Sequence, residues 1–132
     1  MDDHQSYRQR PRSQTEPIEL DANALDLGEI VRPGDTLEWG QGTAEPRALT
    51  SALVAQRYEL SHQGAGRLSI FLGVLKGRTL LPEYTDTFRY FGLGGLGETS
   101  FLSRAGAVEV LPIRLSTVSS LFRAGTLHAD VV

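Results

Sequence analysis

Strand-like and helix-like segments alternate along this chain, and their order constrains the fold more than any other feature. Apolar runs at residues 36–39, 68–75, 88–91 and 108–113 predict four strands, and helical spacing or capping residues occur between them. Alternation of this kind is typical of βα crossover units, which place their strands in parallel. We therefore predict an α/β fold, an open and mostly parallel sheet with helices on both faces.

The predicted helices each have a local signal. Asp21 can cap a short helix, and Pro46 suits the first turn of a longer one. Residues 97–104 favour a short helix, while Ser116 is the expected cap of a last helix that Gly125 ends. The run Arg32-Pro33-Gly34-Asp35 has the chemistry of a tight turn that leads into the first strand.

The two ends of the chain differ in character. Residues 1–17 are polar and nearly free of aliphatic side chains, so we expect a disordered tail, followed by one α/β domain over residues 18–132. The last residues, Ala129 to Val132, resemble the entrance to another buried strand, although a short edge strand is also possible. We expect the domain to be cut inside a larger fold.

Composition excludes several classes of protein. The chain has no cysteine, which removes disulfides and thiolate chemistry and fits a cytoplasmic location. A net charge of −3 with mixed signs argues against nucleic acid as a partner. No stretch is long and apolar enough for a membrane span, so no membrane partner is expected.

The loop Gly40-Gln41-Gly42-Thr43-Ala44-Glu45-Pro46 is the first candidate site. It joins a strand to the start of a helix, where glycines let a ligand approach the backbone and unpaired N–H groups favour an anion or a thioester oxyanion. A tight βα turn without a ligand fits the same residues. For Glu45 we expect a favourable interaction with the helix dipole, not a catalytic role.

A second glycine cluster, Gly92-Leu93-Gly94-Gly95-Leu96-Gly97, matches the dinucleotide pattern GxGxxG and makes a nucleotide-dependent oxidoreductase an alternative. The next strand follows too soon for a full helix and ends in Pro112-Ile113-Arg114 without a carboxylate for the ribose. The chain also has no P-loop and no serine elbow. Its histidines have no partner at ligand spacing, so we expect no metal site.

Two stretches resemble the acetyl-CoA hydrolase/transferase family, which includes the succinyl-CoA:acetate and 4-hydroxybutyrate CoA-transferases. The first runs from Val31 through Pro46 to Leu53, and the second is Val110-Leu111-Pro112-Ile113-Arg114-Leu115-Ser116 with the segment that leads to Val132. The resemblance covers most of residues 25–132 and implies the N-terminal domain of such an enzyme.

The resemblance implies a chemistry and a set of partners. A glutamate of the C-terminal half would attack an acyl-CoA to give an acyl-glutamyl anhydride, which a small carboxylate or water resolves. Coenzyme A would be a substrate, with no permanently bound cofactor, and the full-length enzyme would be a homodimer. This chain would hold no catalytic nucleophile and would be inactive alone.

The same resemblance implies the site residues. The CoA-binding loop would consist of Gly40, Gln41, Gly42, Thr43 and Pro46, and the acyl site would be flanked by Pro112, Arg114 and Ser116. A third class remains open beside the CoA enzyme and the oxidoreductase, a non-catalytic small-molecule sensor of similar fold, because fold alone does not determine function.

Overall fold

A computed structural model describes residues 19–62 and 66–132, so the predicted tail over residues 1–17 lies outside the described part of the chain. The described residues form a sheet of four parallel strands in the order β1-β2-β3-β4. The strands are β1 Thr36–Leu37, β2 Leu68–Leu72, β3 Phe88–Gly92 and β4 Val108–Val110. The predicted α/β class and parallel sheet are confirmed.

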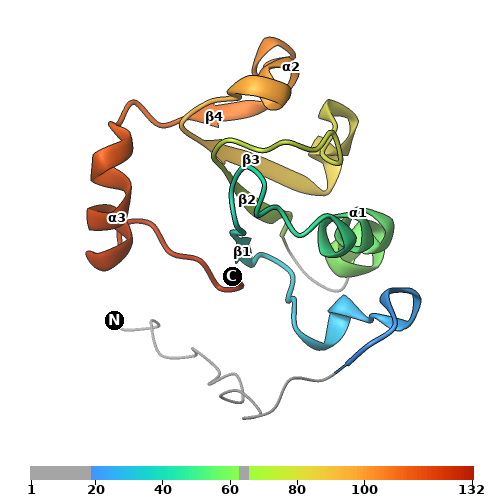
Figure 1. Ribbon diagram of the computed structural model, residues 1–132. Helices are drawn as coiled ribbons and strands as arrows, with labels where there is room; N and C mark the ends of the chain where they lie inside the picture. The colour runs from blue at the N-terminus through green and yellow to red at the C-terminus, as the bar shows by residue number, and fades with distance from the viewer. Residues whose placement is uncertain (1–18, 63–65) are drawn as a thin grey trace.

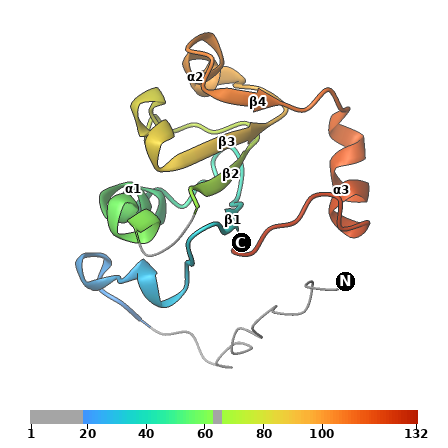
Figure 2. The same ribbon diagram turned by 180° about the vertical axis from the view of Figure 1, so that it is seen from behind.

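Three α-helices accompany the sheet: α1 Arg47–His62, α2 Ser100–Arg104 and α3 Leu115–Arg123. Figures 1 and 2, which view the molecule from opposite sides, show α1 on one side of the sheet and α3 on the other. Short 3₁₀ turns complete the structure at Ala22–Ala24, Leu27–Glu29, Pro82–Asp86 and Gly97–Thr99. Helices therefore lie on both faces of the sheet, as predicted.

The face toward α1 holds the main core. Leu68, Ile70 and Leu72 alternate along β2 and are fully buried, in one cluster with Leu53 and Leu60 of α1. Burial of each such side chain contributes about 1.5–3 kcal/mol. This apolar contact fixes the position of α1, and therefore of the loop that precedes it.

The opposite face is covered less completely. Phe71 of β2 contacts Phe91 of β3 and Phe122 of α3 edge to face, with ring centroids 5.5 and 5.6 Å apart. No residue of α3 is fully buried. Phe122 therefore connects α3 with this face of the sheet.

The C-terminal segment lies beside β1. Val131 pairs with Leu37 in parallel, and Glu38 N donates to the carbonyl of Val131 at 3.0 Å. Asp130 fixes the entry to β1, because its side chain accepts a hydrogen bond from Thr36 N at 2.8 Å. Strand β1 thus lies between β2 and this segment.

Several predicted boundaries need correction. The helix expected after Asp21 is two separate 3₁₀ turns, because the side chains of Asp21 and Asp26 each accept a backbone N–H two residues on and start a turn of only three residues. The last strand stops at Val110 instead of residue 113, because the chain turns after Leu111, where Ile113 N donates to the carbonyl of Leu111 at 2.8 Å and not to β3. The turn before β1 forms as predicted, with Asp35 N donating to the carbonyl of Arg32 and Gly34 at φ 84°.

Candidate functional site at the carboxyl ends of the strands

Loop 40–46 follows β1 and lies against the segment that follows β2. Gly42 N donates to the carbonyl of Val74 at 2.7 Å, and Gly42 forms a parallel bridge with Leu75. Gly42 has φ 61°, a left-handed conformation in which a side chain is strained, and Ala44 N donates to the carbonyl of Gln41 across the turn. The first candidate loop is therefore a fixed structure at the edge where open parallel sheets bind ligands.

Glu45 joins the two loops. Its buried carboxylate accepts hydrogen bonds from Gly77 N at 2.7 Å and Lys76 N at 3.2 Å. The prediction that Glu45 interacts with the helix dipole from the first turn of α1 is wrong, because α1 begins at Arg47 and has no acidic residue in its first turn. A carboxylate held by two N–H groups has a structural role. The absence of a nucleophilic role for Glu45 stays a prediction.

The loop still offers hydrogen-bond donors. The N–H groups of Gly42, Ala44 and Glu45 are used within the protein, whereas those of Gly40, Gln41 and Thr43 make no hydrogen bond among the described residues. Pro46 has no N–H and precedes the first turn of α1, whose N–H groups have no intrahelical acceptor. Five predicted residues therefore lie together in one loop that has free backbone donors.

Two side chains form the base of this loop. Trp39 is 9% exposed, and its indole Nε1 is buried without a partner in the described structure. Gln41 Nε2 donates to the carbonyl of Trp39 at 2.8 Å, and Gln41 Oε1 has no partner. A Cβ on Gly73, the residue after β2, would lie 2.4 Å from Gln41 Oε1. Glycine at position 73 therefore leaves room for the Gln41 side chain. Gln41 thus packs inside the protein and presents only its backbone to a ligand.

Glu38 was not singled out from the sequence. It is partly buried at the end of β1, with no hydrogen-bond or ion-pair partner for its carboxylate among the described residues. Burial raises the pKa of Glu38 above its ordinary value. A carboxylate inside an otherwise apolar strand end, directly before a glycine loop, was a usable sequence signal.

The predicted acyl-site residues lie elsewhere along the same edge. Pro112, Arg114 and Ser116 are exposed after β4, and no hydrogen bond or ion pair connects them with loop 40–46 in the described residues. The ends of β2 and β3 separate the two groups. Ser116 is also not the cap of α3, which begins at Leu115 after an extended Arg114 with no side-chain cap. The structure does not bring the two predicted groups of residues together.

The glycine cluster after β3 has a packing explanation. A Cβ at Gly92 would lie 2.2 Å from the carbonyl oxygen of Leu72, and a Cβ at Gly95 would lie 2.2 Å from that of Thr99. Gly95 N donates to the hydroxyl of Ser103. The following helix, α2, has five residues. This geometry does not favour the dinucleotide alternative, which requires a full helix.

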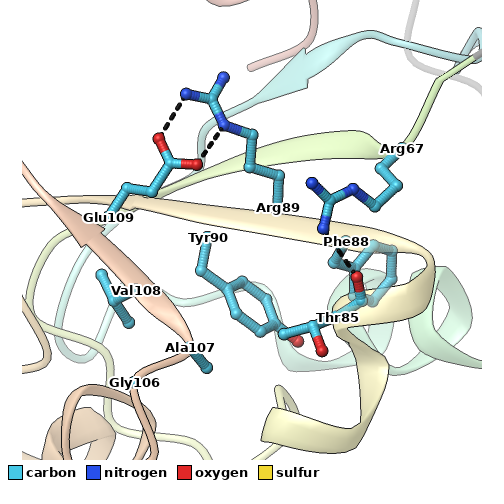
Figure 3. A pocket seen from close by; sticks show the side chains of 9 residues that line it. All are labelled: Arg67, Thr85, Phe88, Arg89, Tyr90, Gly106, Ala107, Val108 and Glu109. Carbon is cyan, nitrogen blue, oxygen red and sulfur yellow. Dashed lines mark hydrogen bonds and ion pairs between the residues drawn. The ribbon is translucent and has the colours of Figure 1, made fainter.

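A hollow of about 260 Å³ lies at the amino ends of β3 and β4, between Arg67, Tyr90 and Glu109 (Figure 3). Its polar side chains already have partners, because Arg89 pairs with Glu109, Arg67 donates to the carbonyl of Thr85, and Tyr90 donates to that of Leu81. Burial is the largest cause of a raised pKa at the Tyr90 hydroxyl, and the nearby Tyr84 raises that pKa further. Tyr90 therefore stays neutral. This hollow lies at the end opposite to loop 40–46, and we assign it no function.

Two further properties concern chemistry and location. Over residues 19–62 and 66–132, no three histidine, aspartate or glutamate residues group so that they could hold a metal ion. None of the helices described is long and apolar enough to cross a membrane.

Comparison with family models, curated proteins and solved structures finds no match to this chain.

Proposed function

We propose that this chain is the N-terminal part of an acyl-CoA hydrolase or CoA-transferase and that loop 40–46 binds the thioester. One observation carries the proposal: the N–H groups of Gly40, Gln41 and Thr43 are unpaired in a loop that Glu45 fixes at the carboxyl edge of the sheet. Fixed backbone donors of this kind stabilise the oxyanion that forms when a nucleophile attacks a thioester carbonyl.

The nucleophile of this proposal is not in the chain. It is a glutamate of a C-terminal half, as the family resemblance implies, and it would form an acyl-glutamyl anhydride with release of the CoA thiolate. A small carboxylate or water would then resolve the anhydride. The proposal includes a cytoplasmic enzyme that is a homodimer at full length, with the 132-residue chain inactive by itself.

Binding of acetyl-CoA to the chain tests the proposal without any turnover. Trp39 is the single tryptophan and precedes the loop directly, so its fluorescence reports on ligand at that position. We expect a saturable change with acetyl-CoA and none with NADH. Saturable binding of NADH instead would support the oxidoreductase alternative and refute this proposal.

A side-chain variant assigns the binding to the loop. Thr43 is exposed and has no positive φ, so Thr43→Phe should fold normally and block access to the free N–H groups. We expect acetyl-CoA binding to weaken at least about tenfold, the equivalent of 1.4 kcal/mol. Glu59→Phe is the matched control, because Glu59 is an exposed residue twelve positions along α1 from Arg47, about 18 Å away along the helix axis. Equal affinities of the two variants would place the ligand elsewhere.

A further inference from the structure

Glu38 lies at the end of β1, two residues before Gly40 and loop 40–46. Its strand neighbours Leu37 and Trp39 are both in the core cluster on the α1 face. Since side chains alternate along a strand, Glu38 belongs to the opposite face. The pairing of Leu37 with Ile70, continued by one residue, places Glu38 beside Phe71, which contacts Phe122 of α3. The carboxyl group therefore lies at the strand end on an aromatic face.

The other two carboxylates in the loops at this edge are already used. Glu45 accepts the N–H groups of Lys76 and Gly77, and Glu98 pairs with Arg78 at 3.7 Å. Glu38 has no such partner among the described residues, although its backbone N–H donates to Val131. A partly buried acid that makes no compensating contact within the protein is a candidate for contact with a ligand.

We propose that Glu38 is the acid–base group of this site, which binds the ligand as a neutral acid and gives its proton to the departing CoA thiolate. The inference rests on the proposed function. In this step the O–H bond of Glu38 breaks and an S–H bond forms on the CoA sulfur, while the electron pair of the O–H bond stays on the carboxylate. Water then returns a proton to Glu38. A proton donor at the leaving group is general acid catalysis.

The charged surroundings are compatible with a neutral acid at this position. On the elements around β1 and loop 40–46 the charged residues include Asp35, Asp130 with His128 at 3.5 Å, Arg123 at the end of α3, and Glu45 with Lys76. None of them causes a resolved shift at Glu38, whose raised pKa comes from burial. Burial therefore moves Glu38 toward the neutral form relative to an exposed glutamate, and an anionic ligand beside it would move it further in that direction.

Proton uptake on binding tests the inference. Calorimetric titration with acetyl-CoA in buffers of different ionisation enthalpy gives the number of protons taken up per ligand. At a pH above the folded pKa of Glu38, where the free protein carries the carboxylate, we expect wild type to take up more protons than Glu38→Gln, with a difference of at most one proton, and both to bind acetyl-CoA. The phosphates of CoA also titrate, with a pKa near 6, but they contribute equally to both proteins and cancel in the difference.

Glu83→Gln is the control, because Glu83 is an exposed glutamate in the turn Pro82–Asp86 before β3, and it should keep the wild-type uptake. Binding with the same proton uptake in wild type and Glu38→Gln would overturn the role of Glu38 alone. Absence of acetyl-CoA binding by the wild-type chain would overturn the proposed function and this inference with it.

The same substitution has a consequence for stability in the absence of ligand. Because the pKa of Glu38 is raised on folding, its contribution to stability is fully present below the ordinary glutamate pKa and is lost as the pH rises through the folded value. Glu38→Gln should remove this loss, so urea unfolding of the variant should depend less on pH above that range. An unchanged pH dependence would show that Glu38 is solvated and would overturn its assignment as a neutral acid.

Discussion

Loss of the Glu45 carboxylate should loosen the candidate loop before it affects any other part of the fold. The side chain is 8% exposed, and one of its oxygens accepts both the Gly77 and the Lys76 N–H groups. These bonds connect residues 31 and 32 positions apart, so no local turn replaces them. Glu45→Ala removes the acceptor and leaves the N–H of Gly77 buried without a partner.

The expected cost follows from those two bonds. A hydrogen bond to a charged group contributes about 1.5–3 kcal/mol, and an unpaired buried donor costs about 1–3 kcal/mol. The Lys76 bond is long at 3.2 Å and contributes less than the Gly77 bond at 2.7 Å. We expect Glu45→Ala to lower the free energy of unfolding by about 2–4 kcal/mol. Glu45→Gln keeps an acceptor but loses its charge, so its cost should be about 1–2 kcal/mol.

Urea unfolding followed by Trp39 fluorescence measures both variants, because the single tryptophan precedes the loop. With a urea dependence of about 2 kcal/mol per molar, the midpoint for Glu45→Ala should fall by about 1–2 M. Glu83→Ala, an exposed control, should remain within about 0.5 kcal/mol of wild type. A value for Glu45→Ala within that same range would refute the interpretation that Glu45 holds the two loops together. An acyl adduct trapped on Glu45 would make Glu45 the nucleophile.

Two further predictions concern residues outside the loop. Gly92→Ala should lower the free energy of unfolding by more than Gly97→Ala, because a Cβ at Gly92 meets the Leu72 carbonyl. Gly97 has open space, so Gly97→Ala should cost only about 1–2 kcal/mol for its positive φ. Equal costs in urea unfolding would contradict the packing explanation. Arg89→Met should raise the pKa of Glu109, which the hydrogen bond from Arg89 holds below its ordinary value. The pair stabilises the fold above the ordinary carboxyl pKa, and this contribution is lost as the pH falls through the folded pKa of Glu109. A carboxyl NMR titration that gives the same Glu109 pKa in both proteins would contradict the pairing.

The elements of this fold could be predicted from the sequence wherever the signal was local. The alternation of strands and helices, the turn at Arg32 to Asp35 and the helix after Pro46 all depend on neighbours in the chain, and the structure has each of them. Strand ends were harder to predict, because they depend on distant partners. Strand β1 is an example, because its alternate backbone groups bond to two distant segments: Asp35 accepts from Ser69 of β2, and Glu38 N donates to Val131 on the other side.

The candidate site shows the same division. Loop 40–46 was found because glycine and proline have local conformational meaning, whereas the acceptors and donors around it come from residues 74–77. For this reason the sequence did not show that Glu45 holds loop 40–46 against residues 76 and 77. It also did not show that the ends of β2 and β3 separate the loop from residues 112–116, because the order of strands in the sheet determines that separation.

The two glycine clusters explain why spacing alone misleads at this edge. In the cluster after β3, the space that a side chain would need at Gly92 and Gly95 is occupied by backbone carbonyls, whereas Gly97 has a positive φ and open space. Loop 40–46 has the same mixture, because Gly42 has a positive φ and open space but a Cβ at Gly40 would lie 2.7 Å from the carbonyl oxygen of Ala44. Glycine spacing therefore does not distinguish the two loops. The helix that follows each loop does: α1 runs from Arg47 to His62 and α2 has five residues, so α1 directs more aligned N–H dipoles toward a ligand.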